Sequence, residues 1–183
     1  MMSKKVLVTI ADGTEELEAV TIIDVLRRAE ADVTVASVGD KQITASRGVK
    51  IVADAVISDC VGSIFDLIVL PGGMPGAEHL RDSSQLTDML KDQAASGRLY
   101  AAICASPAVA LKPHGLLKDK KATCYPSLLL ELDNPEQEKV VVDGNCITSQ
   151  GPATALEFAL KLVELLFDKQ KSKEVAKAML AKN

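Results

Sequence analysis

The stretch that decides the fold is Leu99-Tyr100-Ala101-Ala102-Ile103-Cys104-Ala105-Ser106-Pro107. It starts with an apolar run typical of a buried strand, and Pro107 suits the first turn of a helix. Cys104 therefore lies at the junction of a strand and a helix, with small residues after it. This pattern predicts the sharp turn of a nucleophile elbow, which pushes the side chain out above the sheet. The same residues are also compatible with a buried core cysteine that ends a strand.

The rest of the chain alternates between apolar strands and amphipathic helices. This alternation favours an α/β fold with a mostly parallel sheet and helices on both faces. Asp143-Gly144-Asn145 between two apolar runs predicts a β-hairpin, and Asp12 or Thr14 is expected to cap the first helix. We expect strands over residues 6–10, 33–37, 42–45, 49–53, 67–70, 99–104, 121–123, 140–142 and 146–148, and helices over residues 15–29, 82–96, 105–111, 153–167 and 172–181.

Length and composition indicate one globular domain that spans residues 1–183. With 48% apolar and 25% charged residues, the chain can bury a core without disulfides or metals. The net charge of −4, the scattered basic residues and the lack of tryptophan argue against a nucleic-acid surface. No apolar run approaches the ~20 residues of a membrane span, and the N-terminus lacks a signal-peptide pattern. We therefore expect no membrane partner and a cytoplasmic location.

The cysteines do not suggest a metal site. Cys60, Cys104, Cys124 and Cys146 form no C-x-x-C pair, and the chain has 2 histidines, so zinc has little support. In a reducing cytosol these thiols should be free, and most free thiols are small buried apolar residues. Cys104 differs because a thiol at a helix N-terminus is expected to have a lowered pKa.

In parallel sheets, ligands bind at the carboxyl ends of the strands. At one such end, Gly72 and Gly73 allow close approach of the backbone and turn an N–H group toward a ligand. The N–H groups of Gly73 and Ala105 are therefore candidates for an oxyanion hole, although an ordinary tight turn is the alternative. The glycine pair lacks the spacing of a nucleotide-binding loop, so no cofactor is expected. The segments expected at this edge are residues 11–18, 71–76, 104–107 and 149–152.

A set of motifs in a fixed order resembles a known family. They are Ala11-x-Gly-x-Glu-Glu-x-Glu18, Ser46-Arg47, Val69-Leu70-Pro71-Gly72-Gly73, Ala101-Ala102-Ile103-Cys104-Ala105-x-Pro107 and Thr148-Ser149-x-Gly151-Pro152. Together they resemble the ThiJ/PfpI superfamily, in the branch that includes the Parkinson-disease-associated protein deglycase. The resemblance covers residues from about Lys5 to Phe167.

This resemblance implies a flavodoxin-like three-layer sandwich and a homodimer. It also matches Cys104 to the family's reactive cysteine and Glu18 to the carboxylic acid beside it. From its position alone, Glu18 is a solvated acid in a first helical turn, after a strand expected to neighbour the Cys104 strand. A buried, neutral Glu18 would donate a hydrogen bond to a thiolate, and burial raises a carboxyl pKa as this requires. An ionised Glu18 would instead raise the pKa of the thiol.

The sequence departs from the family pattern where histidines are usual. Tyr125 stands at the histidine position of a Thr-x-His-Pro type of segment, and Ala105 stands where some members place a histidine after the cysteine. His79 and His114 are expected to be surface loop residues. A Cys–His dyad, and with it peptidase or amidotransferase activity, therefore has little support. Glu18 is left as the candidate for moving protons.

Several neighbours are candidates for binding. Arg47 is a candidate for an anion contact at the mouth of the site, and equally for a surface salt bridge. Cys124 is expected to be a small packing residue beside Tyr125. The residues proposed for binding are Gly72, Arg47 and Tyr125.

Two functions fit these residues. The first is a cofactor-free glyoxalase or deglycase, in which Cys104 attacks a small reactive carbonyl compound, or a glycated protein, and Glu18 moves the proton. The second is an oxidative-stress sensor or chaperone that works through oxidation of Cys104. The sequence permits both, since one exposed thiolate serves either chemistry.

Overall fold

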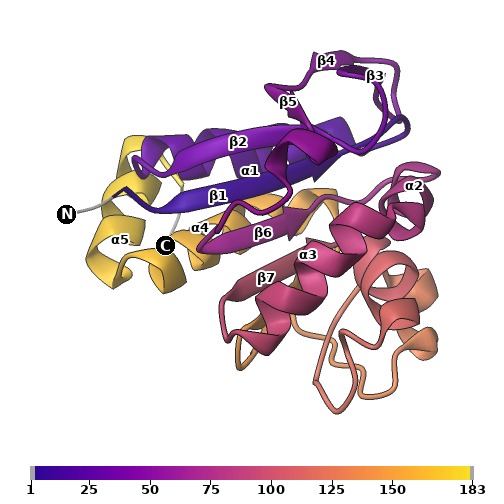
Figure 1. The fold of residues 1–183 in the computed structure, drawn as a ribbon. Helices are drawn as coiled ribbons and strands as arrows, with labels where there is room; N and C mark the ends of the chain where they lie inside the picture. Colours follow the sequence, from indigo (N-terminus) through magenta and orange to yellow (C-terminus); the bar gives the residue numbers. More distant parts are fainter. Residues whose placement is uncertain (1–2, 182–183) are drawn as a thin grey trace.

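The computed structural model describes residues 3–181, which form a seven-stranded sheet in the order β5-β2-β1-β6-β7-β9-β8 (Figure 1). All of its strands run parallel except β8, which is antiparallel to β9. The predicted α/β fold with a mostly parallel sheet is therefore confirmed. The strands are β1 (Lys5–Ile10), β2 (Asp32–Ser37), β5 (Ala55–Val56), β6 (Leu67–Leu70), β7 (Leu99–Ile103), β8 (Val140–Asp143) and β9 (Cys146–Ser149).

Helices cover both faces of this sheet, as Figure 1 shows, with α3 in front and α1 and α4 behind. Helix α5 packs on α4. No helix among residues 3–181 is both long and apolar enough to cross a lipid bilayer. The α-helices are α1 (Glu16–Arg28), α2 (Gly76–Asp82), α3 (Ser84–Ala95), α4 (Ala155–Leu166) and α5 (Lys169–Ala178); short 3-10 helices span Ile57–Cys60, Lys112–His114, Pro126–Glu131 and Pro152–Thr154, and a π-helical turn spans Pro107–Leu111.

The central strands are mostly apolar because both of their faces are buried. Along β1, Val6 and Val8 point to the layer of α1 and α4, whereas Leu7 points to the layer of α3. Strand side chains alternate between faces, so a continuous apolar run supplies two cores at once. The same alternation in β6 and β7 carries both cores across the centre of the sheet.

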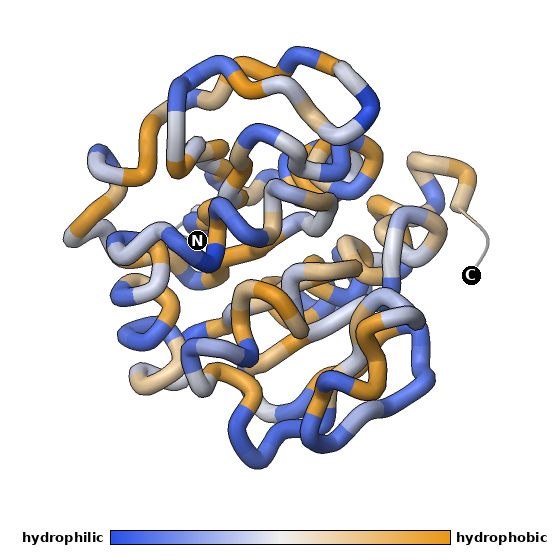
Figure 2. Tube along the Cα trace, turned by 90° about the vertical axis from the view of Figure 1, so that its right-hand side faces the viewer, coloured by the Kyte–Doolittle hydropathy of each residue, from blue (hydrophilic) through white to orange (hydrophobic). Residues whose placement is uncertain are grey.

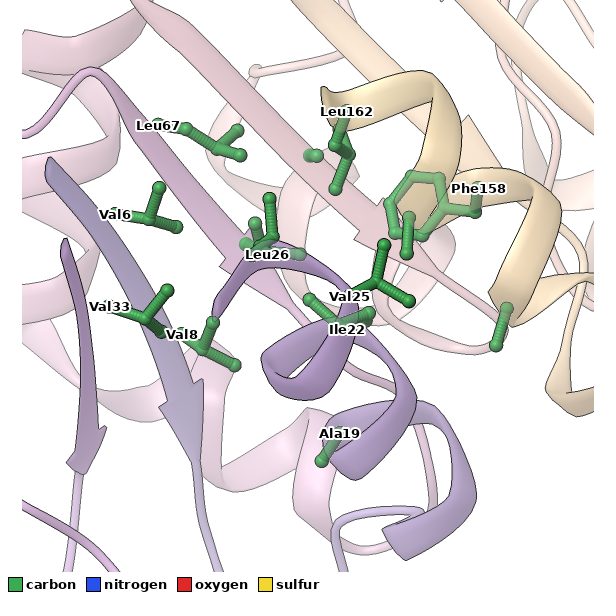
Figure 3. Close-up of a cluster of buried hydrophobic side chains, with 14 of the residues drawn as sticks. Val6, Val8, Ala19, Ile22, Val25, Leu26, Val33, Leu67, Phe158 and Leu162 are labelled. Atoms are coloured by element: carbon green, nitrogen blue, oxygen red, sulfur yellow. The ribbon is translucent and has the colours of Figure 1, made fainter. Parts of the chain in front are cut away.

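The core between α1 and α4 fixes how α1 is rotated on the sheet. Ile22, Val25 and Leu26 of α1 are fully buried and point toward the strands, beside Phe158 of α4 (Figure 3). Residues three, four and seven apart lie on one face of a helix, so Glu18 falls on the same buried face, one turn before Ile22. Packing of apolar side chains therefore turns an acidic side chain inward.

The segment between β2 and β5 forms a hairpin of β3 (Gln42–Thr44) and β4 (Lys50–Val52), which is a separate two-stranded sheet. It arches over one edge of the molecule, and apolar and polar residues alternate along its trace (Figure 2). The hairpin is tied to the start of α1, because the Thr44 N–H donates to Asp12 Oδ1 at 2.7 Å and the Thr44 carbonyl accepts from Gly13 at 2.9 Å.

Some predicted elements were wrong. Residues 121–123 form no strand, because Ala122 makes an isolated bridge to Pro135 and the Thr123 N–H donates to the Thr148 side chain at 2.9 Å. The short strand β5 and helix α2 were not predicted. The helix expected over residues 82–96 is interrupted at Ser83, whose backbone is extended and whose hydroxyl caps α3.

The ends of other helices also differ from expectation. Glu15, rather than Asp12 or Thr14, caps α1 by accepting from the Leu17 N–H at 3.2 Å. Thr14 uses its hydroxyl to close the preceding turn, where it accepts from the Ala11 N–H at 2.9 Å. The segment after the elbow is a π-helical turn rather than a regular α-helix. The remaining helix boundaries are shifted by one to three residues.

Candidate active site

The segments expected at the carboxyl edge of the sheet do meet there. The Glu15 N–H donates to the Gly72 carbonyl at 2.8 Å, and the Cys104 N–H donates to the Ser149 carbonyl at 3.0 Å. The expectation that β1 neighbours β7 was wrong, because β6 lies between them. Glu18 therefore reaches Cys104 across the end of β6, above Gly72. Strand order depends on long-range packing, which a local pattern does not contain.

Cys104 occupies a strained turn, as the elbow pattern predicted. Its φ is +64°, a left-handed conformation that costs a non-glycine residue roughly 1–3 kcal/mol. The backbone is held on both sides: the N–H by Ser149, and the carbonyl by the Tyr125 N–H at 2.8 Å. The residue is 9% exposed, so it is nearly buried.

Glu18 is fully buried beside the elbow. Its Oε2 accepts a hydrogen bond from the Gly72 N–H at 2.7 Å. Its Oε1 has no hydrogen-bond partner among residues 3–181, although the carboxyl group interacts with the Cys104 thiol. The solvated position inferred from the sequence alone was therefore wrong, and the buried position implied by the resemblance is correct. An unpaired buried oxygen favours the protonated form, which can donate to sulfur.

Burial raises the pKa of Glu18 from 4.5 to about 7, against the opposing effects of the Gly72 N–H and the thiol. The nearby charge of Glu15 raises it slightly further. A carboxyl group with this pKa exchanges its proton near neutral pH, which suits general acid–base catalysis.

The thiol of Cys104 does not have the lowered pKa that a helix N-terminus suggested. Burial raises it, and an ionised Glu18 raises it further. The N–H groups of Gly73 and Ala105 act in the opposite direction but do not outweigh burial. The carboxyl therefore ionises near pH 7 and the thiol only at higher pH, so the pair holds one proton between these two ionisations.

Neighbouring atoms pack so closely against Gly72 and Gly73 that neither position has room for a side chain. A Cβ on Gly72 would lie 2.6 Å from the Cys104 Cβ and 2.8 Å from the Ile103 carbonyl oxygen. Gly73 has a φ of +90°, and a Cβ there would lie 2.4 Å from the Glu15 nitrogen. The N–H groups of Gly73 and Ala105 both stabilise negative charge on the sulfur, which places them at the reacting atom. This is the arrangement expected of an oxyanion hole.

The other predicted binding residues, Tyr125 and Arg47, have exposed side chains. Tyr125 is 45% exposed, and its ring lies 3.5 Å from the position of a Cβ on Gly151. The Arg47 side chain is exposed and makes no ion pair or hydrogen bond within residues 3–181; its backbone N–H donates to Glu16 at 2.9 Å. Cys124 is buried in the core on the other face of the sheet, in agreement with a packing role.

The hydrogen-bond partners of the two histidines are backbone and side-chain groups other than the Cys104 sulfur. His79 is an exposed residue of α2 whose Nδ1 is 3.0 Å from the Asp12 carbonyl oxygen, rather than a loop residue. His114 lies in a short helix and its Nε2 is 2.8 Å from the Arg81 carbonyl oxygen. Within the described part of the chain, no group of three or more His, Cys, Asp or Glu residues is arranged to hold a metal ion.

The sequence did not predict one buried polar contact at the site, which is made by Ser106. Ser106 looked like one of the small residues that a crowded turn requires. Its hydroxyl instead donates to the Pro71 carbonyl at 2.5 Å, across from the elbow to the glycine loop. The signal available was a hydroxyl group in an otherwise apolar turn.

A family model described as DJ-1/PfpI matches residues 4–165 of the chain. The chain belongs to the DJ-1/PfpI family. Its match to oxidized DJ-1 from Toxoplasma gondii has a TM-score of 0.97 at 49% identity, covers 99% of this chain and 100% of that one, and confirms the flavodoxin-like fold. The resemblance inferred from the motifs is thereby confirmed, in the DJ-1 branch.

Some sequence relatives are longer than this DJ-1/PfpI chain. It is 51% identical to Protein DJ-1 homolog B of Arabidopsis thaliana over 179 residues, which are 96% of this chain and 41% of the relative. The chain thus spans less than half the length of that relative. It is 35% identical to the glutathione-independent glyoxalase DJR-1.2 of Caenorhabditis elegans, over 92% of this chain and 91% of the relative.

Gly72→Ala is expected to disrupt the site. The added methyl group meets the backbone of Ile103 and the Cys104 side chain, so we expect a loss of about 1–3 kcal/mol in the free energy of unfolding. The rate at which iodoacetamide alkylates Cys104 should change about tenfold as the sulfur moves. Gly39→Ala is the control, because a Cβ there meets nothing within 4 Å. Equal free energies of unfolding and equal alkylation rates in the two variants would contradict this prediction.

Glu18→Gln is expected to remove a pH dependence of stability. The pKa of Glu18 is raised from 4.5 to about 7, so the folded state keeps a proton that the unfolded state releases in this range. The stabilisation is complete below pH 4.5 and is lost as pH rises through 7. The free energy of unfolding of wild type, relative to the variant, should therefore fall by ~3 kcal/mol between these limits.

Urea denaturation across this pH range measures the effect, and Glu16→Gln is the matched control. Partial burial raises the pKa of Glu16, but hydrogen bonds from its own backbone, Arg47 and Ser46 lower it more. A lowered pKa gives stabilisation that is lost as pH falls, so the control should show the opposite sign. Parallel curves for wild type and Glu18→Gln would show that Glu18 ionises normally.

Proposed function

We propose that this protein is a cysteine-dependent, cofactor-free glyoxalase or deglycase. Its substrates would be dicarbonyls of the methylglyoxal type, or their early adducts on glycated proteins, and its products hydroxy acids. The observation that carries the proposal is the buried Glu18 carboxyl, with a pKa of about 7, against the Cys104 thiol. The Caenorhabditis elegans relative, named as a glutathione-independent glyoxalase, supports the same chemistry.

The first step is addition of sulfur to the aldehyde. The Cys104 sulfur bonds to the aldehyde carbon, the C=O π bond opens, and the oxygen becomes an alkoxide held by the N–H groups of Gly73 and Ala105. Protonation of this alkoxide gives a hemithioacetal. The proton comes from the pair formed by Glu18 and the thiol, which holds one proton once Glu18 has ionised.

The second step is isomerisation by Glu18. Its carboxylate removes the proton from the carbon that bears sulfur, and the resulting enediol takes a proton back on the neighbouring carbon. The product is a thioester of the hydroxy acid, which water hydrolyses to lactate and free thiol. Methylglyoxal and one water thus give lactate with no net redox change, and neither metal nor nucleotide takes part.

We also propose a partner and a location for this protein. Leu17 and Val20 of α1 are apolar and about half exposed, at 52% and 51%, which supports a protein contact on this helix. We assign this contact to a second copy of the chain in a homodimer, in the cytoplasm. Tyr125 and Arg47 would line the path of the substrate to Cys104.

Cys104→Ala is expected to abolish formation of lactate from methylglyoxal, because no other group supplies the covalent intermediate. The loss should reach at least about 10³-fold in kcat/KM, measured by enzymatic assay of lactate. Cys60→Ala is the control, since this thiol lies in the core near the opposite edge of the sheet. Full lactate production by Cys104→Ala would exclude the mechanism.

A second candidate function is sensing of oxidants. The N–H groups at the Cys104 sulfur would stabilise an oxidised, anionic form, and a Toxoplasma gondii relative has been solved in an oxidized state. Mild peroxide should then add two oxygen atoms to Cys104 before the other thiols react. Intact-mass measurement of wild type and Cys104→Ala tests this, and earlier oxidation of another cysteine would contradict it.

A further inference from the structure

The N–H groups of Gly73 and Ala105, which face the Cys104 sulfur, belong to two segments that follow different strands. We call these two segments the arms of the anion site. Gly73 follows β6 and Ala105 follows β7, and the two strands pair as far as Leu70 and Ala102. Beyond this pair the ladder ends, so sheet hydrogen bonds no longer fix the distance between the arms. An oxyanion hole needs both N–H groups aimed at one point, within a few tenths of an ångström.

Each arm is attached to a different part of the molecule. The glycine arm is held by α1 and α2, because the Gly72 carbonyl accepts from Glu15 at 2.8 Å and the Gly73 carbonyl accepts from Ala77 at 2.9 Å. The elbow is held from the other side of the sheet, by Ser149 at the end of β9 and by the Tyr125 N–H. Small movements of either side would change the separation of the arms.

Ser106 connects them. Its hydroxyl donates to the Pro71 carbonyl at 2.5 Å, and the side chain is fully buried. Beside the contact of the Gly73 N–H with the Cys104 sulfur, this hydrogen bond joins residues 71–73 directly to residues 104–106. Residues 71–73 offer no side-chain donor or acceptor, so a side-chain hydrogen bond between the two segments has to start from the elbow.

We propose that Ser106 is a positioning residue, which fixes the Gly73 and Ala105 N–H groups at the distance that binds an anion on, or next to, the Cys104 sulfur. This role rests on the proposed function for its effect on turnover. Its effect on the sulfur itself does not, because the same N–H groups stabilise the thiolate form of Cys104 in the protein without substrate.

Removal of the hydroxyl has a defined consequence. Ser106→Ala leaves the Pro71 carbonyl buried without a donor, and a buried polar group without a partner is driven to find another. As the carbonyl turns, Gly72 and Gly73 turn with it, and the Gly73 N–H leaves the sulfur. The thiolate then loses one of its two backbone donors. A general loosening of the fold would instead expose the sulfur to reagents.

The test compares Ser106→Ala with Ser106→Thr, which keeps the hydroxyl, and with Gln93→Met. Gln93 is the matched control, since its side-chain amide donates to the carbonyls of Phe65 and Leu99 at 3.0 Å each. It thus links the same two strands at their opposite ends, and its loss also breaks buried hydrogen bonds. Iodoacetamide alkylation of Cys104 at pH 8, kcat and KM for methylglyoxal, and thermal stability are measured for all three.

Ser106→Ala should slow alkylation about 3–10-fold, because loss of a donor raises the pKa of the thiol. It should lower kcat about 10–100-fold while KM changes less than about twofold, as expected for a donor that acts on the transition state. Ser106→Thr should stay within about threefold of wild type. Gln93→Met should lose stability without slowing alkylation or turnover.

The proposal is overturned if Ser106→Ala behaves like Gln93→Met, with lower stability but unchanged or faster alkylation and unchanged kcat. If Ser106→Thr does not fold because of its added methyl group, the comparison of Ser106→Ala with Gln93→Met still decides whether Ser106 positions the two N–H groups. If wild type forms no lactate, the proposed function fails, and the alkylation rates alone decide whether Ser106 positions the donors.

Discussion

The burial of the Glu18 carboxyl constrains everything else at this site. A buried carboxylate is costly, and raising its pKa from 4.5 to about 7 corresponds to ~3 kcal/mol. Burial of Ile22, Val25 and Leu26 on the same face of α1 contributes roughly 1.5–3 kcal/mol for each side chain. The apolar face therefore outweighs the carboxyl and holds it against Cys104. The same packing that stabilises the fold thus creates the acid–base group.

Backbone geometry supplies the rest of the site. Cys104 is held at a positive φ between Ser149 and Tyr125, and Gly72 leaves room for both the sulfur and the carboxyl. Neither feature needs a special side chain, which explains why a chain without the usual histidine can still build the site. Tyr125 contributes through its N–H, and any residue other than proline at this position could do the same.

The sequence predicted the parts of the site that depend on local patterns. The elbow was visible because a strand, a cysteine, small residues and Pro107 follow one another directly. The burial of Glu18 was not visible without the family pattern, because an acid in a first helical turn is usually solvated. The order of β1, β6 and β7 and the bond from Ser106 were missed because both depend on segments brought together by folding. Residues 121–123 look like a strand locally, but their hydrogen bonds go to a bridge and to a side chain.

The thiol's pKa alone does not decide what the site can do. A pKa lowered by three units would raise the thiolate fraction at pH 7 roughly 30-fold but reduce its nucleophilicity roughly 20-fold. Here burial raises the pKa instead, so even this small gain is missing. Reactivity must then come from position: a sulfur, a proton and two N–H groups already placed around one point. Such placement is worth up to roughly 7–11 kcal/mol in favourable cases, far more than any shift in ionisation. The strained turn at Cys104 and the links that hold it are therefore the features on which either function depends.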